Sequence, residues 1–304
     1  MLLRRTAAAA AAATLGGSYY HFAQRKAAAL AEPAATPTSV LTSSIVLRDG
    51  RRLAFHTSGG GSTPVYAFHG MGSSHLTWLG SPVAELSKEV TLVAVDRPGY
   101  GDSSDPPACY TYSQWCQDLA QLADALGHKK FAVAGHSSGG PYALAAAALL
   151  PERVVACAAI SSDPPYAHPD APEPVRTGGA DLGGPTYGLD PFSRFGKWRD
   201  GSLKSGQAAK LHAWKGGVVG FVTDFNLERL PWSFRIEDIA LGGAITFWVG
   251  EKDFEVIKDG APWMQSLVKG SRLVVVPGGD HGFKSKPEHL KAILDDLVRA
   301  ARAQ

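Results

Sequence analysis

Ser137 has the residue type and the local setting that nucleophilic catalysis requires. It is the middle residue of a Gly-His-Ser-Ser-Gly segment at 135–139, after the apolar run Phe131 to Ala134 and before the Ala- and Leu-rich stretch Tyr142 to Leu150. A serine hydroxyl becomes a good nucleophile only on a sharp turn beside a base and an anion-binding backbone. The two glycines permit such a turn because they have no Cβ to clash at positive φ. We therefore predict Ser137 as the nucleophile of a strand–turn–helix unit.

The matching base and acid are predicted after two later strands. His281 follows the apolar run Leu273 to Val276, and Asp253 follows the run Ala244 to Val249. Each of the three residues then lies on a loop just after a strand, in the chain order Ser, Asp, His. Among the known triad orders, this one is typical of the α/β-hydrolases. We predict His281 as the general base and Asp253 as the acid that orients it.

Two other aspartates compete for the acid role. Asp163 follows the earlier strand-like run Val154 to Ile160 and stays open as an alternative acid. Asp280 directly precedes His281, and we interpret it as a turn residue because a sequence neighbour rarely reaches the adjacent imidazole.

The anion-binding half of the site is predicted from a second glycine-rich turn. The run Val65 to Phe68 leads into a His-Gly-Met-Gly segment at 69–72. Gly70 and Gly72 let the backbone curl so that the N–H of Met71 points toward the substrate oxygen. The N–H of Ser138 is the second donor, because unpaired amides and the helix dipole favour negative charge at a helix N-terminus. A plain glycine-rich turn is the alternative interpretation.

Three further histidines lie close to these segments. His136 precedes the nucleophile; as a base it is a lesser candidate, because on the turn its side chain is expected to point away. His69 is predicted to brace the oxyanion loop, and His75 is a weak candidate for substrate contact.

From Ser44 to its end, the chain resembles the α/β-hydrolase fold serine hydrolases, in particular a capped, esterase-like subgroup. The triad order and four further segments carry the resemblance; these are 96–104, 139–143, 231–239 and 250–253. Two segments depart from the pattern. Leu241 to Ala244 replaces a proline before the seventh strand, and Phe254 to Val256 replaces a Val-Pro after the acid, which leaves the shape of the Asp253 loop in doubt. The resemblance implies a mechanism more than a substrate.

Beyond residue 40, strand and helix patterns alternate with short connections. This alternation predicts an α/β fold, with a mostly parallel central sheet covered by helices on both faces. Asp49-Gly50 predicts a hairpin between Ser44–Val46 and Arg52–His56. A helix is expected over Thr111 to Gly127, ending at that glycine. Apolar residues at helical spacing predict a last helix around Leu290 to Val298.

The alternation fails over 164–235, between the sixth and seventh strands, where the family inserts a cap. The first part is rich in proline and glycine, and the pattern becomes more helical around Phe192 to Asn226. Long irregular segments in compact domains are usually lids or disordered. Aromatic residues of this cap line an acyl or alcohol pocket or pack within the cap: Trp198, Trp214, Phe221, Phe225 and Trp232. The cap is also basic, which favours a solvated face, with attraction of acidic substrates as the alternative.

Composition fits one soluble enzyme domain at 41–304. The chain has 304 residues, 45% hydrophobic and 19% charged, and a net charge of +2. We therefore expect no nucleic-acid partner. Cys109, Cys116 and Cys157 lack metal-type spacing and are interpreted as free thiols, with a Cys109–Cys116 bridge as the alternative. We expect no metal and no cofactor.

Residues 1–40 are interpreted as a targeting leader and linker. No acid precedes Glu32, whereas Arg4, Arg5, Arg25 and Lys26 are basic, and long alanine runs separate them. Such leaders resemble organellar transit peptides, so a chloroplast or mitochondrial location is expected. An export signal and a membrane anchor are the alternatives, and contact with a membrane is expected only if the leader is retained.

The predicted activity is hydrolysis of a small-molecule, ester-like substrate through an acyl-enzyme on Ser137. Acyl transfer to another acceptor and carbon–carbon bond hydrolysis use the same triad and stay open. A receptor that binds a small molecule on a hydrolase scaffold is the alternative from a different class.

Overall fold

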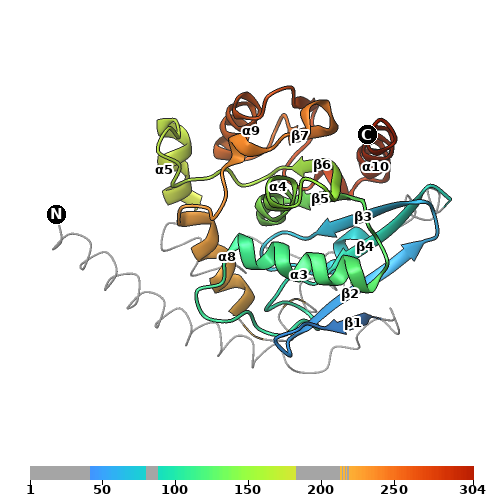
Figure 1. Ribbon diagram of the computed structural model, residues 1–304. Helices are drawn as coiled ribbons and strands as arrows, with labels where there is room; N and C mark the ends of the chain where they lie inside the picture. Colours follow the sequence, from blue (N-terminus) through green and yellow to red (C-terminus); the bar gives the residue numbers. More distant parts are fainter. Residues whose placement is uncertain (1–41, 80–87, 183–212, 214, 216, 218) are drawn as a thin grey trace, which may run out of the picture.

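An eight-stranded sheet forms the centre of the computed structural model, which describes residues 42–79, 88–182, 213, 215, 217 and 219–304 (Figure 1). The spatial order of the strands is β1-β2-β4-β3-β5-β6-β7-β8. At one edge, β1 pairs with β2 and β2 with β4 in antiparallel fashion. The six strands from β4 through β3 and β5 to β8 pair in parallel. The mostly parallel sheet is therefore confirmed. The strand bounds are β1 (Ser43–Val46), β2 (Arg52–Gly59), β3 (Thr63–Phe68), β4 (Val90–Val95), β5 (Phe131–His136), β6 (Val154–Ile160), β7 (Ile245–Gly250) and β8 (Arg272–Val276).

Helices cover both faces of this sheet. On one face lie α3 (Tyr112–Ala125), α4 (Gly140–Leu149) and α9 (Glu255–Leu267), whereas α10 (Pro287–Arg302) covers the other (Figure 1). The pleat of β3 explains how one strand serves both layers, because Tyr66 and Phe68 belong to the first core and Val65 and Ala67 to the second. Both faces are thus closed by apolar packing, as parallel sheets require.

Local sequence signals explain where these elements begin and end. Thr111 starts α3 with a capping box, in which its side chain accepts the N–H of Gln114 and the Gln114 side chain accepts the N–H of Thr111. The helix ends next to Gly127, which has φ of 73°, a conformation that favours glycine. The hairpin between β1 and β2 is also as predicted, with φ of 86° at Gly50.

The helices α5 and α9 are additions to the sequence-based picture. α5 (Glu173–Leu182) lies in a stretch expected to be irregular because of its prolines and glycines. α9 directly follows the predicted acid loop, where no helix was singled out. Within 164–235, the described part also contains α8 (Val219–Arg229) and the short helix η4 (Ile236–Asp238) follows it. The rest of the predicted cap, including Trp198 and Trp214, lies outside the described residues.

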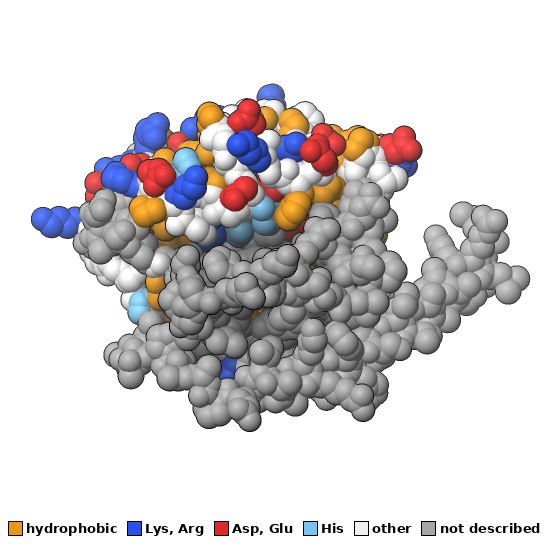
Figure 2. Space-filling view, turned by 180° about the vertical axis from the view of Figure 1, so that it is seen from behind, with side chains coloured by type: hydrophobic (Ala, Val, Ile, Leu, Met, Phe, Trp, Pro, Cys, Tyr) orange, Lys and Arg blue, Asp and Glu red, His pale blue; other side chains and the backbone are white. Residues whose placement is uncertain are grey.

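The structure tests the expectation about the cysteines but not the one about the N-terminal leader. The predicted leader at 1–40 lies outside the described residues. In the described part, no helix is long and apolar enough to cross a membrane. All three cysteines are free, so the alternative Cys109–Cys116 bridge is wrong. Figure 2 shows basic and acidic side chains interspersed over the described part of the face seen from behind.

The parallel strands bring the loops of the predicted site to one edge. β5 lies between β3 and β6 in the sheet, and β7 and β8 continue from β6. The loops after the carboxyl ends of parallel strands meet at the same edge of a sheet, where ligands of open α/β folds bind. Segments that are distant in sequence therefore become neighbours. They contain residues 69–72, 137–139, 161–163, 253 and 281.

Candidate active site

Ser137 occupies a tight turn between β5 and α4. Its φ is 54°, a left-handed conformation that costs free energy for a residue other than glycine. A Cβ at Gly135 would lie 2.1 Å from the carbonyl oxygen of Gly139, and a Cβ at Gly139 would lie 2.4 Å from the carbonyl oxygen of Phe68. The expected reason for the glycines is therefore wrong. They provide room for close backbone contacts, while the serine itself takes the positive φ.

The His281 imidazole bridges Ser137 and Asp253. Its Nε2 lies 2.9 Å from the Ser137 Oγ, and its Nδ1 lies 2.7 Å from the Asp253 Oδ1. With the ring proton on Nδ1, the imidazole donates to the carboxylate and its Nε2 accepts the serine hydroxyl proton. Three side chains that are far apart in sequence thus form one continuous chain of hydrogen bonds.

Asp253 is held as a carboxylate by its donors. Burial raises the pKa of Asp253, but hydrogen bonds from His281, Ser161 and the N–H of Phe254 outweigh burial and hold the pKa below its usual range. The Ser161 hydroxyl donates to Oδ2 at 2.6 Å, and the Phe254 N–H donates to Oδ1 at 2.8 Å. Sequence reasoning missed Ser161. Its position directly after β6, like that of Ser137 after β5, was the available signal.

The competing acids do not bind the imidazole. Asp163 is buried, and its carboxylate accepts from the Tyr166 hydroxyl at 2.7 Å and from the Ser138 hydroxyl at 3.4 Å. Asp280 is exposed and accepts the N–H of Gly282 at 3.0 Å, as a turn residue does. The structure therefore places Asp253, and neither of these two, at the Nδ1 of His281.

The segment predicted as the oxyanion loop lies against Ser137. A Cβ built on Gly70 would be 3.1 Å from the Cβ of Ser137, so only glycine gives this approach without a shift of neighbours. Met71 follows directly, and Ser138 is buried at the start of the helical turn. The backbone of both segments is thus close to the serine hydroxyl.

His69 holds this loop to its neighbour. Its Nδ1 lies 2.8 Å from the Gly70 carbonyl oxygen, and its Nε2 accepts the N–H of Arg97 at 3.1 Å. Only the neutral tautomer with the proton on Nδ1 makes both bonds. Burial lowers the pKa of His69 well below its usual range, in agreement with a neutral ring.

The other two histidines are bound in the interior. The His136 Nε2 lies 2.8 Å from the carbonyl oxygen of His281, and the two rings are 5.2 Å apart. Burial lowers the pKa of His136, so the neutral ring donates to that carbonyl and braces the loop of the candidate base. The His75 backbone N–H and ring both bind the Asp96 carboxylate, and only 1% of His75 is exposed. This burial contradicts the suggestion that His75 contacts substrate.

A buried lysine behind the site was not predicted. Lys284 is only 2% exposed; its Nζ donates to the Thr77 carbonyl at 3.0 Å and lies 4.3 Å from the centre of the Trp78 ring. Burial lowers the pKa of Lys284 to about 7. The side chain links η6 (Phe283–Ser285), which follows the His281 loop, to η1 (His75–Trp78), which follows the oxyanion segment.

A buried carboxylate attaches the helix α8 to the loop after β4 and to the start of α4. Asp224 pairs with the Arg97 guanidinium and accepts the hydroxyls of Tyr100 at 2.6 Å and of Tyr142 at 2.8 Å. Arg97 also lies 4.4 Å from the centre of the Tyr142 ring. From the sequence, only a family resemblance was evident for the segment 96–104 and the start of α4. Their polar side chains provide the socket for α8.

A second acid of α8 lies beside Ser138. Glu228 follows Asp224 by one helical turn and is 3% exposed. Burial raises the pKa of Glu228 well above its usual range, and the neighbouring carboxylates Asp163 and Asp224 raise it further. The Ser138 hydroxyl and Arg229 lower this pKa, but they do not offset the rise. Burial also raises the pKa of Asp163. Two buried acids therefore flank the residue that follows the nucleophile.

The described aromatic residues of the cap region make packing contacts. Phe221 is buried, the Phe225 ring lies 3.7 Å from the Arg229 guanidinium, and Trp232 contacts Tyr112 at a ring separation of 5.7 Å. Packing was one of the two roles expected for them.

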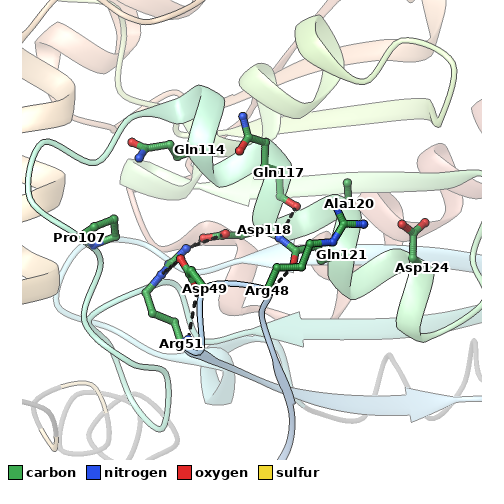
Figure 3. Close-up of a pocket in the computed structure, with 10 residues that line it drawn as sticks. All are labelled: Arg48, Asp49, Arg51, Pro107, Gln114, Gln117, Asp118, Ala120, Gln121 and Asp124. Carbon is green, nitrogen blue, oxygen red and sulfur yellow. Dashed lines mark hydrogen bonds and ion pairs between the residues drawn. The ribbon is translucent and has the colours of Figure 1, made fainter.

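A cavity of about 400 Å³ lies away from these residues, between the β1–β2 hairpin and α3 (Figure 3). Arg51 in its wall is paired with both Asp49 and Asp118, and the Arg48 N–H is bound by Gln121. Three of its charged side chains, Arg51, Asp49 and Asp118, are thus already paired with one another. Among the described residues, no group of His, Cys, Asp and Glu side chains is arranged to hold a metal ion.

Sheet, turn and hydrogen-bonded side chains define a protein of the α/β-hydrolase class. A family model described as alpha/beta hydrolase fold matches residues 63–197. Human serine hydrolase BPHL is 30% identical over 271 residues, which cover 83% of this chain and 84% of that protein. The chain belongs to the α/β-hydrolase fold family.

The chain is also similar to two further proteins. The dihydrolipoyllysine-residue acetyltransferase component of the acetoin cleaving system from Cupriavidus necator is 36% identical over 113 residues, 37% of this chain; the match spans only 30% of that protein. An esterase from Exiguobacterium antarcticum superposes with a TM-score of 0.66 at 20% identity, covering 84% of this chain and 99% of that one. The second likeness shows the fold alone.

Proposed function

We propose that this protein is a serine hydrolase that cleaves small-molecule carboxylic esters. The observation that carries the proposal is the His281 imidazole, which lies within hydrogen-bond distance of both Ser137 and Asp253. Membership of the hydrolase family supports it.

The proposed reaction has two steps. His281 takes the proton of Ser137 as the hydroxyl oxygen attacks the ester carbonyl, and Asp253 stabilises the imidazolium that forms. The imidazolium then gives this proton to the leaving alcohol, and an acyl-enzyme remains. Water, activated by the same imidazole, releases the acid and restores the serine.

The backbone supplies the other half of the proposed catalysis. The N–H groups of Met71 and Ser138 bind the oxyanion, and Gly70 brings the first of them close to the nucleophile. Removing a donor from such a site typically slows acyl transfer by ~10²–10³.

A fluorophosphonate probe tests the proposal. We expect the wild type to be labelled and Ser137→Ala and His281→Ala to lose labelling, together with hydrolysis of p-nitrophenyl acetate. Ser162→Ala, a buried serine on a neighbouring loop, is the matched control and should still be labelled. A folded wild type that is not labelled and hydrolyses no ester would favour a receptor built on the same scaffold.

A further inference from the structure

Phe254 is an exposed aromatic side chain at the candidate catalytic base. Its ring centre lies 4.8 Å from that of His281, with an angle of 44° between the ring planes. Phe254 is 36% exposed, and the His281 side chain is 27% exposed. Among the described residues, the other large exposed hydrophobic side chains are Val46, Leu149, Leu230 and Val275. Phe254 is the aromatic member of this set.

Hydrogen bonds hold the backbone of Phe254 on both sides of its Cα. Its N–H donates to the Asp253 Oδ1 at 2.8 Å, the carboxylate oxygen that also binds His281. Its carbonyl oxygen accepts the N–H groups of Ile257 and Lys258, both at 3.0 Å, in the first turn of α9. Because both backbone groups are bound, the Cα that carries the ring is held beside the imidazole.

The proposed chemistry determines which part of a substrate meets this ring. The proton that leaves the His281 Nε2 goes to the alcohol oxygen of the ester, so that oxygen must come within hydrogen-bond reach of the imidazole. The alcohol portion beyond that oxygen therefore lies next to the imidazole. Among the described residues, His136 also lies close to the imidazole, at a ring separation of 5.2 Å, and its Nε2 is bound to the His281 carbonyl oxygen. In the described part of the chain, Phe254 is thus an exposed apolar side chain within reach of the alcohol portion.

We propose that Phe254 is a specificity-determining residue that binds the alcohol portion of the ester and favours apolar, bulky leaving alcohols. The inference rests on the proposed ester hydrolysis. A flat aromatic ring gains free energy by covering apolar surface of a ligand, and gains nothing from a methyl group too short to reach it.

The test compares two acetates that share one acyl group and release alcohols of similar acidity, methyl acetate and 2-phenylethyl acetate. In Phe254→Ala we expect kcat/KM for 2-phenylethyl acetate to fall by about tenfold, the scale of a lost contact in an apolar pocket, and kcat/KM for methyl acetate to change by less than about twofold. Phe254→Leu, which stays apolar, should lose less. Val46→Ala, at the opposite edge of the sheet, is the matched control and should change neither value.

Fluorophosphonate labelling separates the possible failures. Equal losses for both esters with slower labelling would mean that Phe254 only positions His281, which overturns the inference and leaves the proposed function intact. Unchanged values for both esters in a folded, labelled Phe254→Ala protein would overturn it as well. A wild type that is neither labelled nor active on either acetate would overturn the proposed function and this inference with it.

Discussion

The three residues of the hydrogen-bonded chain from Ser137 to Asp253 differ in how they are held. The turn after β5 holds Ser137 in a strained backbone conformation with φ of 54°. Hydrogen bonds at both ring nitrogens position His281. Asp253 is positioned by Ser161, which itself has a φ of 44°. Two strained serines after neighbouring strands thus orient the two ends of the site. Such strain persists only where the surrounding structure holds it.

Asparagine substitutions at the two buried aspartates separate their roles. Asp253→Asn should lower kcat for p-nitrophenyl acetate by about 10⁴, because the amide no longer fixes the tautomer of His281. Asp163→Asn should retain activity within about twofold and stay labelled by a fluorophosphonate. Steady-state kinetics on both folded variants provide the measurement. The reverse pattern would assign the acid role to Asp163.

At the scale of elements, α8 carries polar groups on its buried side. Asp224 and Glu228 lie one turn apart on the same face, and both point into a region with two cations, Arg97 and Arg229. Burial of a charge costs free energy unless a partner compensates it. The position of α8 is therefore tied to the 96–104 loop by a specific ion pair.

Removing the Asp224 carboxylate should destabilise the protein strongly. Asp224→Ala leaves the buried Arg97 guanidinium without its partner, which typically costs about 3–5 kcal/mol and would lower Tm by roughly 5–10 °C. Asn226→Ala, an exposed residue of the same helix, is the control. Asp224→Leu combined with Arg97→Met should recover part of the loss, because neither charge is then buried alone. Equal Tm values for Asp224→Ala and Asn226→Ala would refute the ion-pair argument.

At the scale of the whole molecule, two apolar layers fix the sheet, and several buried charged side chains lie where its loops meet. The layers close on either side of β3 and β5. Lys284 connects the loops at that edge from the buried side, with a pKa of about 7. Its protonation therefore affects the stability of the entire fold.

The stability of the protein should depend on pH through Lys284. Burial lowers its folded pKa from 10.5 to about 7, so the favourable effect of the neutral amine is present above pH 10.5 and is lost as pH falls through 7. Lys284→Met removes this titration. As the pH falls from 10.5 to 7, we expect the unfolding free energy of the wild type to decrease relative to that of Lys284→Met. Below pH 7 the difference between the two proteins should stay constant. Urea unfolding across this range measures it, with the exposed Lys286→Met as control. A difference that is independent of pH would contradict the assignment.

The amino-acid sequence by itself determined the sheet, its strand order along the chain, and the loops that carry Ser137, Asp253 and His281. Apolar strand runs and the glycines that follow them are local signals, because neighbouring residues in the chain determine them. Only the tertiary structure decided the contacts of Ser161 with Asp253, 92 residues apart, and of Arg97 with Asp224, 127 residues apart. It also decided that Phe254 lies on His281. These contacts depend on how separate strands and helices pack in space. No pattern within a short stretch of chain encodes which distant residues will meet.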